Sequence, residues 1–479
     1  MNASRKRVVV VGGGIGGLTA AAFLGRAGHR VTLLEANDYL GGKSRRIELE
    51  GQRIDTGPAI VTFPGVWDEL LRRWDVLGGE ANGGGAREIA GLELERLPRV
   101  GKYYYRGEAS SLPVEEGHPW YEAWERFVGV HGELGPEVTR LLTTDWYDPR
   151  LRPALLRLLR LYGTRMTTRS YLDSLGWLPE GLREVIAIHT MNAGVGPART
   201  PALFASMPAI MAVDGVWVPE GGVYEIVRAL VKLARYSGVK LRTGEPVRRI
   251  ERGKVSTAKG EHAADVVVSG LDADRLESII APGKKPAREK LTCSGVAIYA
   301  ALEEELPERV ANHGVVLPTH PAGLYRSLEA GEEPEEAMAF VDYYRPGEPY
   351  PNERSVLAVG LTVPANGREY GLEDAFVARE MQRVGREMSL PRPIDEYFGS
   401  YEILHPSYFG GWGSVGGALY GKIQPVWRSG PLHQPRYSDR RRPWLWRVGA
   451  SVHPGGGIPA VLGGAMISTG RLLKALEDR

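Results

Sequence analysis

The chain has 479 residues, enough for about three domain-sized units at roughly 150 residues per domain. Its 60 basic and 58 acidic residues leave a net charge of +2, which argues against a uniformly basic nucleic-acid binder. Hydrophobic residues make up 43% of the chain, so sizeable cores can form. We therefore expect a folded protein with no nucleic-acid partner.

Cysteine content and hydropathy limit the class further. Cys293 is the single cysteine, so no disulfide within the chain and no thiolate metal site can form. No uninterrupted apolar stretch approaches the ~18 residues of a membrane-spanning helix, and the first residues show no signal-peptide pattern. The sequence therefore predicts a cytoplasmic protein that is soluble or lies on a membrane surface.

The N-terminal segment predicts a βαβ unit. Residues 8–11 are four consecutive valines typical of a buried strand, and residues 18–27 are an apolar helix that Gly28 ends. Residues 29–34 predict a second strand, which Glu35 follows. Between the first strand and the helix, three glycines have the G-x-G-x-x-G spacing: Gly12, Gly14 and Gly17. Together these features indicate a dinucleotide-binding loop.

The residue types in this segment suit a dinucleotide. The glycines permit a tight turn, a close approach of the pyrophosphate and close packing of helix on strand. The helix N-terminus supplies N–H donors and a positive dipole end for phosphate. Glu35 can accept hydrogen bonds from ribose hydroxyls and would repel a 2′-phosphate.

A second glycine loop follows Glu35 and contains Gly41, Gly42 and Lys43. Its glycines allow backbone to approach a ligand, and Lys43 or Arg45 can neutralise phosphate. This double-glycine-plus-basic segment resembles the flavin amine oxidase and phytoene desaturase superfamily. The resemblance implies that the loop lies along the pyrophosphate and ribityl chain of FAD.

The C-terminal segment is similar to the signature of bacterial-type phytoene desaturases. A strand at 445–448 leads into a glycine-rich loop, so that residues 448–459 have the V-G-A-x-x-H-P-G-G-G-I-P pattern, and a helix is expected at 460–476. The resemblance implies FAD contacts for Gly449, Ala450, Ser451, Ile458 and Pro459. We interpret His453 as a packed core histidine rather than a proton-transfer group.

Two shorter segments extend the resemblance. Residues 215–222 resemble the family pattern G-V-W-[YF]-P-x-G-G and precede a predicted helix at 223–236, and residues 55–58 match D-x-G-P, which includes Gly57. By resemblance, Val247 contacts adenine through its backbone. The chain departs from the family in having Lys43 where Arg is usual. It also lacks a clear match for an acidic residue proposed as an acid–base group in some members.

The predicted fold class is α/β, with an FAD-binding Rossmann-like (GR2-type) nucleotide domain interleaved with a substrate-binding α+β domain. The glycine-rich residues 78–85 mark the first boundary, and the aromatic residues 103–105 lie in sequence expected to be irregular. The FAD-binding parts are expected at 1–85, 215–275 and 431–479. The substrate-binding parts are expected at 86–214 and 276–430.

The resemblance implies an FAD-dependent oxidoreductase that desaturates phytoene or a later acyclic carotene, with oxygen or a quinone as electron acceptor. FAD is expected to be non-covalent, because the chain has no cysteine just before the terminal motif. Asp145, Asp148 and Glu396 are acidic candidates that we interpret as surface or cap residues. No catalytic side chain is assigned.

A hydrocarbon substrate dissolves in a bilayer, so we expect peripheral contact with the inner face of the cell membrane. Residues 150–166 predict an amphipathic helix for this contact. Its expected lipid-facing residues are Leu151, Leu155, Leu158 and Tyr162, and its expected polar face carries Arg152, Arg157 and Arg160.

Two other functions remain open at this point. One is a flavin amine or porphyrinogen oxidase, which would share the cofactor motifs. The other is a non-enzymatic lipid-binding module like the GDP-dissociation inhibitors, which share the architecture without using FAD. The intact glycine loop, Glu35 and the complete terminal motif argue against the second.

Overall fold

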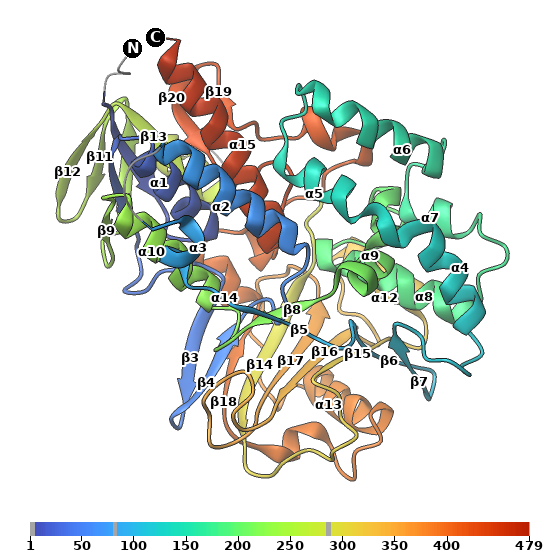
Figure 1. The fold of residues 1–479 in the computed structure, drawn as a ribbon. Coiled ribbons are helices and arrows are strands. Elements are labelled where there is room, and N and C mark those ends of the chain that lie inside the picture. The colour runs from blue at the N-terminus through green and yellow to red at the C-terminus, as the bar shows by residue number, and fades with distance from the viewer. Residues whose placement is uncertain (1–4, 80–83, 284–288, 479) are drawn as a thin grey trace.

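The structure is a computed structural model and describes residues 5–79, 84–283 and 289–478. Figure 1 shows a sheet with covering helices near the two termini, a group of helices beside it, and a second large sheet below. The predicted α/β class with a Rossmann-like nucleotide fold is confirmed.

The first sheet has six strands in the order β19-β20-β13-β1-β2-β9. Parallel pairing joins β20, β13, β1, β2 and β9, and β19 pairs antiparallel at the edge. The strands are β1 (Arg7–Val11), β2 (Arg30–Leu34), β9 (Lys240–Arg242), β13 (Val266–Ser269), β19 (Ser438–Asp439) and β20 (Arg442–Arg447). The sheet therefore collects strands from three separate parts of the chain.

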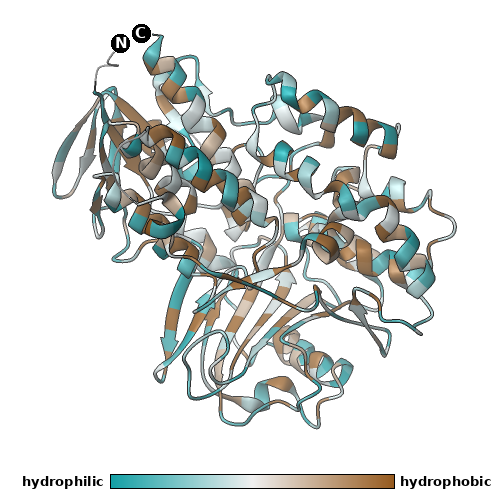
Figure 2. Ribbon diagram, in the orientation of Figure 1, coloured by the Kyte–Doolittle hydropathy of each residue, from teal (hydrophilic) through white to brown (hydrophobic). Residues whose placement is uncertain are grey.

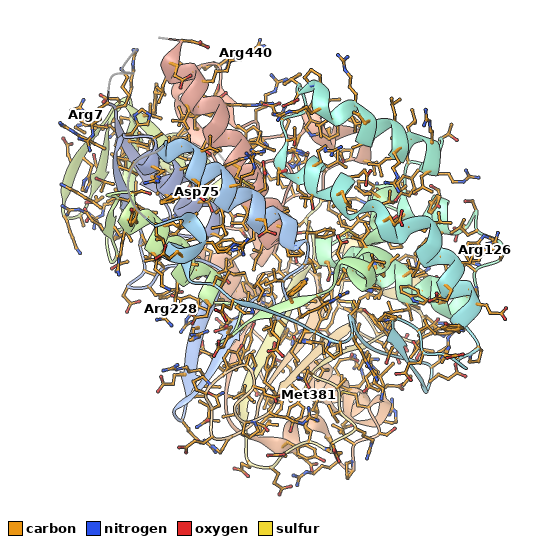
Figure 3. The ribbon with its side chains drawn as sticks, viewed as in Figure 1. Arg7, Asp75, Arg126, Arg228, Met381 and Arg440 are labelled. Atoms are coloured by element: carbon orange, nitrogen blue, oxygen red, sulfur yellow. The ribbon has the colours of Figure 1, made fainter. Side chains whose placement is uncertain are left out.

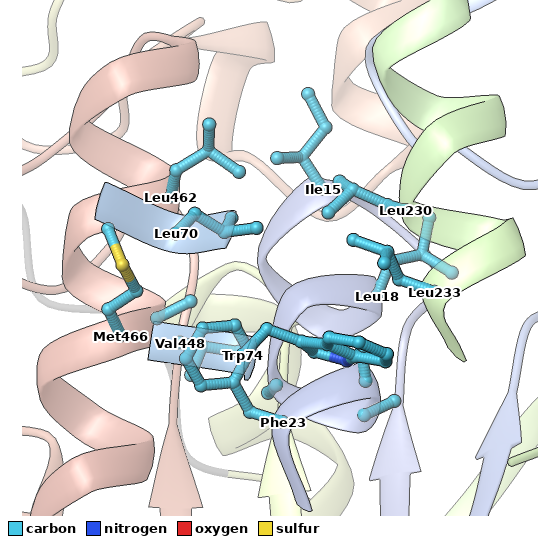
Figure 4. Packing of buried hydrophobic residues seen from close by; sticks show 14 of the residues in the cluster. Ile15, Leu18, Phe23, Leu70, Trp74, Leu230, Leu233, Val448, Leu462 and Met466 are labelled. Carbon is cyan, nitrogen blue, oxygen red and sulfur yellow. The ribbon is translucent and has the colours of Figure 1, made fainter. Parts of the chain in front are cut away.

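Helix α1 (Ile15–Arg26) packs between α10 (Glu225–Tyr236) and α15 (Ile458–Glu477), and α2 (Pro64–Gly78) covers the group. Figure 4 shows Leu18 of α1 close to Leu233 of α10, with Met466 of α15 on the other side. Trp74 of α2 is fully buried in the same cluster. Each such side chain contributes about 1.5–3 kcal/mol on burial, so this core fixes α1 and α15 side by side.

A smaller sheet adjoins the first and holds β10 (Val247–Glu251), β11 (Gly253–Thr257) and β12 (Gly260–Ala264), with α11 (Ala273–Ile280) against it. The hairpin of β3 (Arg45–Leu49) and β4 (Gln52–Thr56) lies against the second large sheet. A short antiparallel pair joins β5 (Leu94–Arg96) to β8 (Trp217–Pro219).

The second large sheet has seven strands in the order β18-β14-β17-β16-β15-β6-β7. Only β15 and β6 pair in parallel among these described strands. Helix α13 (Ala375–Glu387) packs on it, and Figure 3 labels its fully buried Met381. The strands are β6 (Gly101–Tyr105), β7 (Glu108–Leu112), β14 (Ser294–Leu302), β15 (His313–Val316), β16 (Ala339–Tyr344), β17 (Val356–Val363) and β18 (Phe398–Leu404).

The remaining helices lie mainly beside the two large sheets. They are α3 (Ala86–Ala90), α4 (Tyr121–His131), α5 (Gly135–Thr143), α6 (Arg152–Tyr162), α7 (Thr168–Leu172), α8 (Glu180–Ile188), α9 (Met207–Asp214), α12 (Pro321–Ala330) and α14 (Pro406–Gly411). Single 3-10 turns lie at 132–134, 149–151, 189–193, 202–206, 394–397, 415–417, 426–428 and 430–432. Figure 2 shows apolar and polar residues alternating around α6.

The element predictions are accurate in type, with some errors. The helix expected at 18–27 begins three residues earlier, because the backbone turns into α1 directly after Gly14. Residues 103–105 belong to strand β6, which corrects the expectation of irregular structure: their side chains are buried where β6 joins β15. Residues 80–83 of the glycine-rich spacer lie outside the described residues. The domain boundaries remain a prediction.

None of the helices in the described part of the chain is long and apolar enough to cross a bilayer.

Candidate functional site

The two N-terminal glycine loops meet at the carboxyl end of β1. Gly41 donates from its backbone N–H to the carbonyl of Gly13 at 2.9 Å, and Gly14 and Gly41 form an isolated parallel bridge. Gly42 lies so close that a Cβ there would stand 3.1 Å from the Cα of Gly14. The structure therefore brings Gly12, Gly14, Gly41 and Gly42 into one cradle.

The glycines of this cradle have different roles. A Cβ on Gly17 would collide with the carbonyl of Gly12, and one on Gly41 would collide with the carbonyl of Ser44. Gly12 and Gly41 also have φ values of +99° and +118°, a region that favours glycine. A Cβ on Gly14 would stand 3.9 Å from the carbonyl O of Gly41 and from the Cα of Gly42, which is ordinary van der Waals contact. Gly17 thus serves close packing, whereas Gly14 is where the second glycine loop touches the start of α1.

The N-terminus of α1 points its donors into this space. Its N-cap is Gly14, no side chain caps it, and its first turn carries no acidic residue. The first backbone N–H groups of a helix have no partner within the helix and form a positive dipole end. This is the arrangement that binds a pyrophosphate.

Glu35 stands at the carboxyl end of β2 and is only 6% exposed. Its Oε2 accepts the N–H of Gly13 at 2.6 Å, and its Oε1 accepts the backbone and side-chain N–H groups of Asn37 at 2.9 and 2.8 Å. Because a carboxylate has about four acceptor positions, capacity remains for a ribose hydroxyl. Glu245, two residues before the predicted adenine-contacting Val247, donates its N–H to the Glu35 carbonyl at 2.8 Å.

Lys43 lies at the other side of the cradle and forms an ion pair with Asp272, a residue that no sequence motif predicted. Lys43 Nζ is 3.3 Å from Asp272 Oδ2, 3.3 Å from Ser414 Oγ and 3.1 Å from the carbonyl of Leu419. Ser451 of the terminal motif donates to Asp272 Oδ1 at 3.4 Å. Only its position in the chain could have indicated this role: Asp272 follows the carboxyl end of β13, and ligands of α/β folds bind at the carboxyl ends of the strands.

Gly57 follows the β3–β4 hairpin and is held against the large seven-stranded sheet. Its N–H donates to the hydroxyl of Tyr299 in β14 at 3.1 Å. The neighbouring Asp55 is buried and accepts from Arg46 at 2.6 Å and from the backbone N–H of Tyr224 at 2.8 Å. The D-x-G-P segment therefore anchors the hairpin β3–β4 to α10 and to the large sheet.

The terminal motif borders the same cradle. A Cβ on Gly16 would lie 2.9 Å from the backbone N of Gly449, so α1 and the terminal loop touch at this point. Helix α15 begins at Ile458 with Gly457 as an uncapped N-cap, and Pro459 follows in its first turn. Ala450 stands between Gly449 and Ser451 in the same loop. Gly455 and Gly457 have open space where a Cβ would point.

His453 is a packed histidine, as interpreted from the sequence. Its Nε2 accepts the indole N–H of Trp146 at 2.7 Å, and its ring lies beside that of His433. Burial, with smaller contributions from His433 and Arg471, lowers the pKa of His453 to about 3. The imidazole is therefore neutral near pH 7.

The three acidic candidates have structural roles or lie at the surface. Asp145 is paired with Arg471, with Oδ1 2.6 Å from Nη2. Asp148 caps the turn at 149–151 through the backbone N–H of Arg150 at 2.9 Å. Glu396 is exposed.

The prediction of which side of the 150–166 helix faces lipid is wrong, because that side faces the protein core. Leu151 and Tyr162 are 1% and 6% exposed, and Leu158 packs against core clusters. Helical periodicity defines an apolar stripe, but here the protein's own core covers that stripe. The exposed apolar residues of α6 are instead Leu156 and Leu159, which share the surface with Arg152, Arg157 and Arg160.

Together, the uncapped α1 N-terminus, the carboxylate of Glu35 and the open glycine positions fit the phosphates and ribose of FAD. They define a dinucleotide-binding protein of Rossmann-like fold. The model of the flavin containing amine oxidoreductase family matches residues 15–306, and the chain belongs to this family.

Curated relatives and solved structures agree with this assignment. A zeta-carotene-forming phytoene desaturase of Myxococcus xanthus is 28% identical over 98% of this chain and 94% of its own. A hydroxyneurosporene desaturase of Cereibacter sphaeroides is 28% identical over 95% of this chain and 94% of its own. Cyclohexylamine oxidase from Brevibacterium oxydans has the same fold, with a TM-score of 0.62 at 15% identity over 99% of this chain and 100% of its own.

Proposed function

We propose that this chain is an FAD-dependent carotenoid desaturase that removes two hydrogens from phytoene or a later acyclic carotene. The observation that carries the proposal is one site built from both ends of the chain, in which Lys43 and Ser451 meet at Asp272 beside the glycine cradle. Carotenoid desaturases that are similar along nearly the whole chain support this choice of substrate.

The residues of the site bind and orient the cofactor. Glu35 would hold the ribose, the N-termini of α1 and α15 would face the pyrophosphate and the flavin, and Lys43 would compensate phosphate charge. Bound FAD supplies a hydride acceptor for a saturated carbon, whose neighbour loses a proton as the new C=C bond forms. Oxygen or a quinone then takes up the two electrons.

We infer that FAD is bound without a covalent link. Covalent attachment to cysteine needs a reactive thiolate. Cys293 is buried, and burial raises the pKa of its thiol to about 12. Acid precipitation of the yellow protein should therefore release free FAD, and flavin retained in the pellet would contradict this inference.

We propose that α6 docks on the cytoplasmic side of an anionic membrane through its outer surface. Leu156 is 52% exposed and Leu159 is 63% exposed, and Arg152 and Arg160 lie beside them. Such a surface can bury apolar side chains among lipid headgroups while arginine pairs with anionic lipid. Peripheral docking would give the site access to a substrate dissolved in the bilayer.

The activity is tested by anaerobic mixing of the flavin-loaded protein with phytoene or a later acyclic carotene in liposomes. We expect the oxidised flavin band to bleach while the carotene absorption moves to longer wavelength, and oxygen or quinone to restore the flavin. A panel of amines serves as the control. Bleaching by an amine, with all carotenes inert, would replace the desaturase by an amine oxidase.

A further inference from the structure

The loop at residues 425–436 carries large apolar side chains on the outside of the molecule. It contains the 3-10 turns at 426–428 and 430–432 and leads to the edge strand β19. Trp427 is 60% exposed and Leu432 is 52% exposed, although tryptophan and leucine side chains are usually buried. Neither side chain belongs to the cofactor site described above, so their exposure needs a separate explanation.

This loop lies against the segment that leads into α6. A Cβ on Gly430 would lie 2.6 Å from the indole ring of Trp146, so the two segments touch. The next residue, Tyr147, is exposed, and α6 begins soon after it at Arg152. The exposed apolar side chains of the loop, of Tyr147 and of the outer surface of α6 therefore gather in one region, which is typical of an interaction surface.

The loop and the start of the hairpin that follows it are strongly basic. Residues 425–441 contain one acidic residue and four arginines, which are Arg428, Arg436, Arg440 and Arg441. None of these four pairs with a carboxylate within the part of the chain that the structure describes; the first such pair of the hairpin joins Arg442 to Glu277 at 3.9 Å. Figure 3 shows Arg440 at the same end of the molecule as α6. The region therefore attracts anionic groups.

Tryptophan, leucine and arginine together match the chemistry of a bilayer surface. Tryptophan rings prefer the level of the lipid headgroups, where one edge is apolar and the other is wet. Apolar side chains enter the boundary of the acyl chains while arginine pairs with anionic lipid. A soluble polyanion would also pair with the arginines, but it would leave Trp427 and Leu432 in water.

The same loop is connected to the terminal motif. Trp146, on which Gly430 packs, donates its indole N–H to Nε2 of His453 at 2.7 Å. The hydroxyl of Tyr437 donates to the backbone carbonyl of His453 at 2.7 Å, and the ring of His433 lies beside the His453 imidazole. Because His453 belongs to the loop that precedes α15, residues 425–437 connect the exposed surface to the proposed flavin site.

We propose that residues 425–436 form a second membrane-docking loop, in which Trp427 and Leu432 enter the interfacial region of an anionic bilayer beside α6. The proposal rests on the proposed desaturase function and deepens it, because it places the bilayer surface next to the terminal motif. A carotene then passes from the bilayer to the site without crossing water.

Cys293 makes a direct test possible, because it is the single cysteine, is buried and has a thiol whose pKa burial raises to about 12. The environment-sensitive fluorophore NBD is attached to Trp427→Cys and to Leu432→Cys in the full-length protein. With phosphatidylglycerol vesicles we expect its emission to move to shorter wavelength and to rise about twofold or more. The matched control is Tyr401→Cys on β18, at the opposite end of the molecule, which should not respond.

This readout needs no activity, so it separates docking from the reaction. Unchanged emission at both loop positions would overturn the proposal, as would an equal response to soluble polyglutamate. A response of labelled Leu156→Cys without one in the loop would confine docking to α6 and would also overturn it. If the labels respond but no carotenoid is desaturated, the proposed function fails and the docking loop stands.

Trp427→Ser with Leu432→Ser tests the link between docking and substrate supply. Both side chains are exposed, so the variant should keep the wild-type melting temperature. We expect its rate with carotene in liposomes to fall about tenfold, and its rate with detergent-solubilised carotene to change less than about twofold. An equal loss in both assays would mean that the loop acts on the folded site rather than on the bilayer, and would overturn the proposal.

Discussion

Lys43 and Asp272, which are 229 residues apart in the chain, form an ion pair with a distance of 3.3 Å between Nζ and Oδ2. Asp272 also accepts from Ser414 and Ser451, so one carboxylate connects the second glycine loop to the terminal motif. Both charged side chains are largely screened from water. This pairing positions the Lys43 ammonium beside the glycine cradle.

Replacing Asp272 should loosen the cofactor without unfolding the protein. Asp272→Asn keeps the shape but removes the charge that holds Lys43, so we expect FAD affinity to fall about tenfold, as for the loss of one charge-assisted hydrogen bond. Titration of the deflavinated protein with FAD measures this affinity. The matched control is Asp274→Asn. Asp274 lies on α11 and pairs with Lys422, so this variant should keep the wild-type affinity for FAD. Unchanged affinity in Asp272→Asn would remove this carboxylate from the site.

Gly14 of the cradle and Gly17 of helix α1 should respond differently to alanine. Gly14→Ala should preserve the fold, because its Cβ would stand 3.9 Å from the Gly41 carbonyl O and the Gly42 Cα without a clash. It should abolish FAD binding, because the added methyl group would stand at the N-cap of α1, where the pyrophosphate would lie. Gly17→Ala should instead lower the melting temperature, because its Cβ collides with the Gly12 carbonyl. The control Gly129→Ala lies in α4 with open space around the Cβ and should stabilise by about 0.5–1 kcal/mol. A flavin-loaded Gly14→Ala protein would contradict the assignment.

Glu35 should contribute to ribose recognition through its charge. Glu35→Gln removes the carboxylate that accepts from Gly13 and Asn37, so we expect FAD affinity to fall by roughly ten- to a hundredfold. Isothermal titration with FAD and with riboflavin distinguishes the causes. Riboflavin lacks the adenosine ribose, so its affinity should not change. Glu48→Gln on the exposed side of β3 serves as the control.

Stability should decrease in mild acid. Burial lowers the pKa of His131 and His189 to about 4 and that of His453 to about 3, against about 6.5 in an unfolded chain. The unfolded state therefore binds more protons between about pH 4 and 6.5, and stability is lost as pH falls through this window. Each group contributes at most about 1.4 kcal/mol per pH unit.

Urea unfolding at pH 7, 6 and 5 measures this slope. His453→Gln should flatten it, since glutamine can still accept from Trp146 but does not titrate. Identical slopes in wild type and His453→Gln would mean that His453 does not contribute to acid sensitivity.

The outer surface of α6 should determine membrane binding. Leu156→Ser with Leu159→Ser removes its exposed apolar side chains, and we expect sedimentation with anionic liposomes to weaken more than tenfold. Arg152→Glu with Arg160→Glu should weaken it similarly, because each basic residue near the surface contributes about 1 kcal/mol. Arg157 is left unchanged because it pairs with Glu137 at 2.8 Å. Tyr401→Ser on β18 is the control, and equal sedimentation of all variants would exclude α6 as the docking surface.

The sequence by itself determined the parts of the fold that are local. The valine run, the glycine spacing and Glu35 specify the first βαβ unit, because its two strands, its helix and Glu35 all lie within residues 7–35. The terminal motif likewise predicted β20 and α15 correctly in type. Their resemblance to known desaturases predicted the family and a flavin cofactor, which the family match confirms.

Tertiary structure alone decided which residues meet and which faces are covered. The pattern of α6 defines an apolar stripe, but only packing shows that Leu151 and Tyr162 face inward while Leu156 and Leu159 stay exposed. Asp272 has no local motif, and its role follows from the parallel pairing of β13 with β1, which sets it beside the glycine cradle. Side-chain burial and pairing between distant segments depend on the whole chain, so no local pattern contains them.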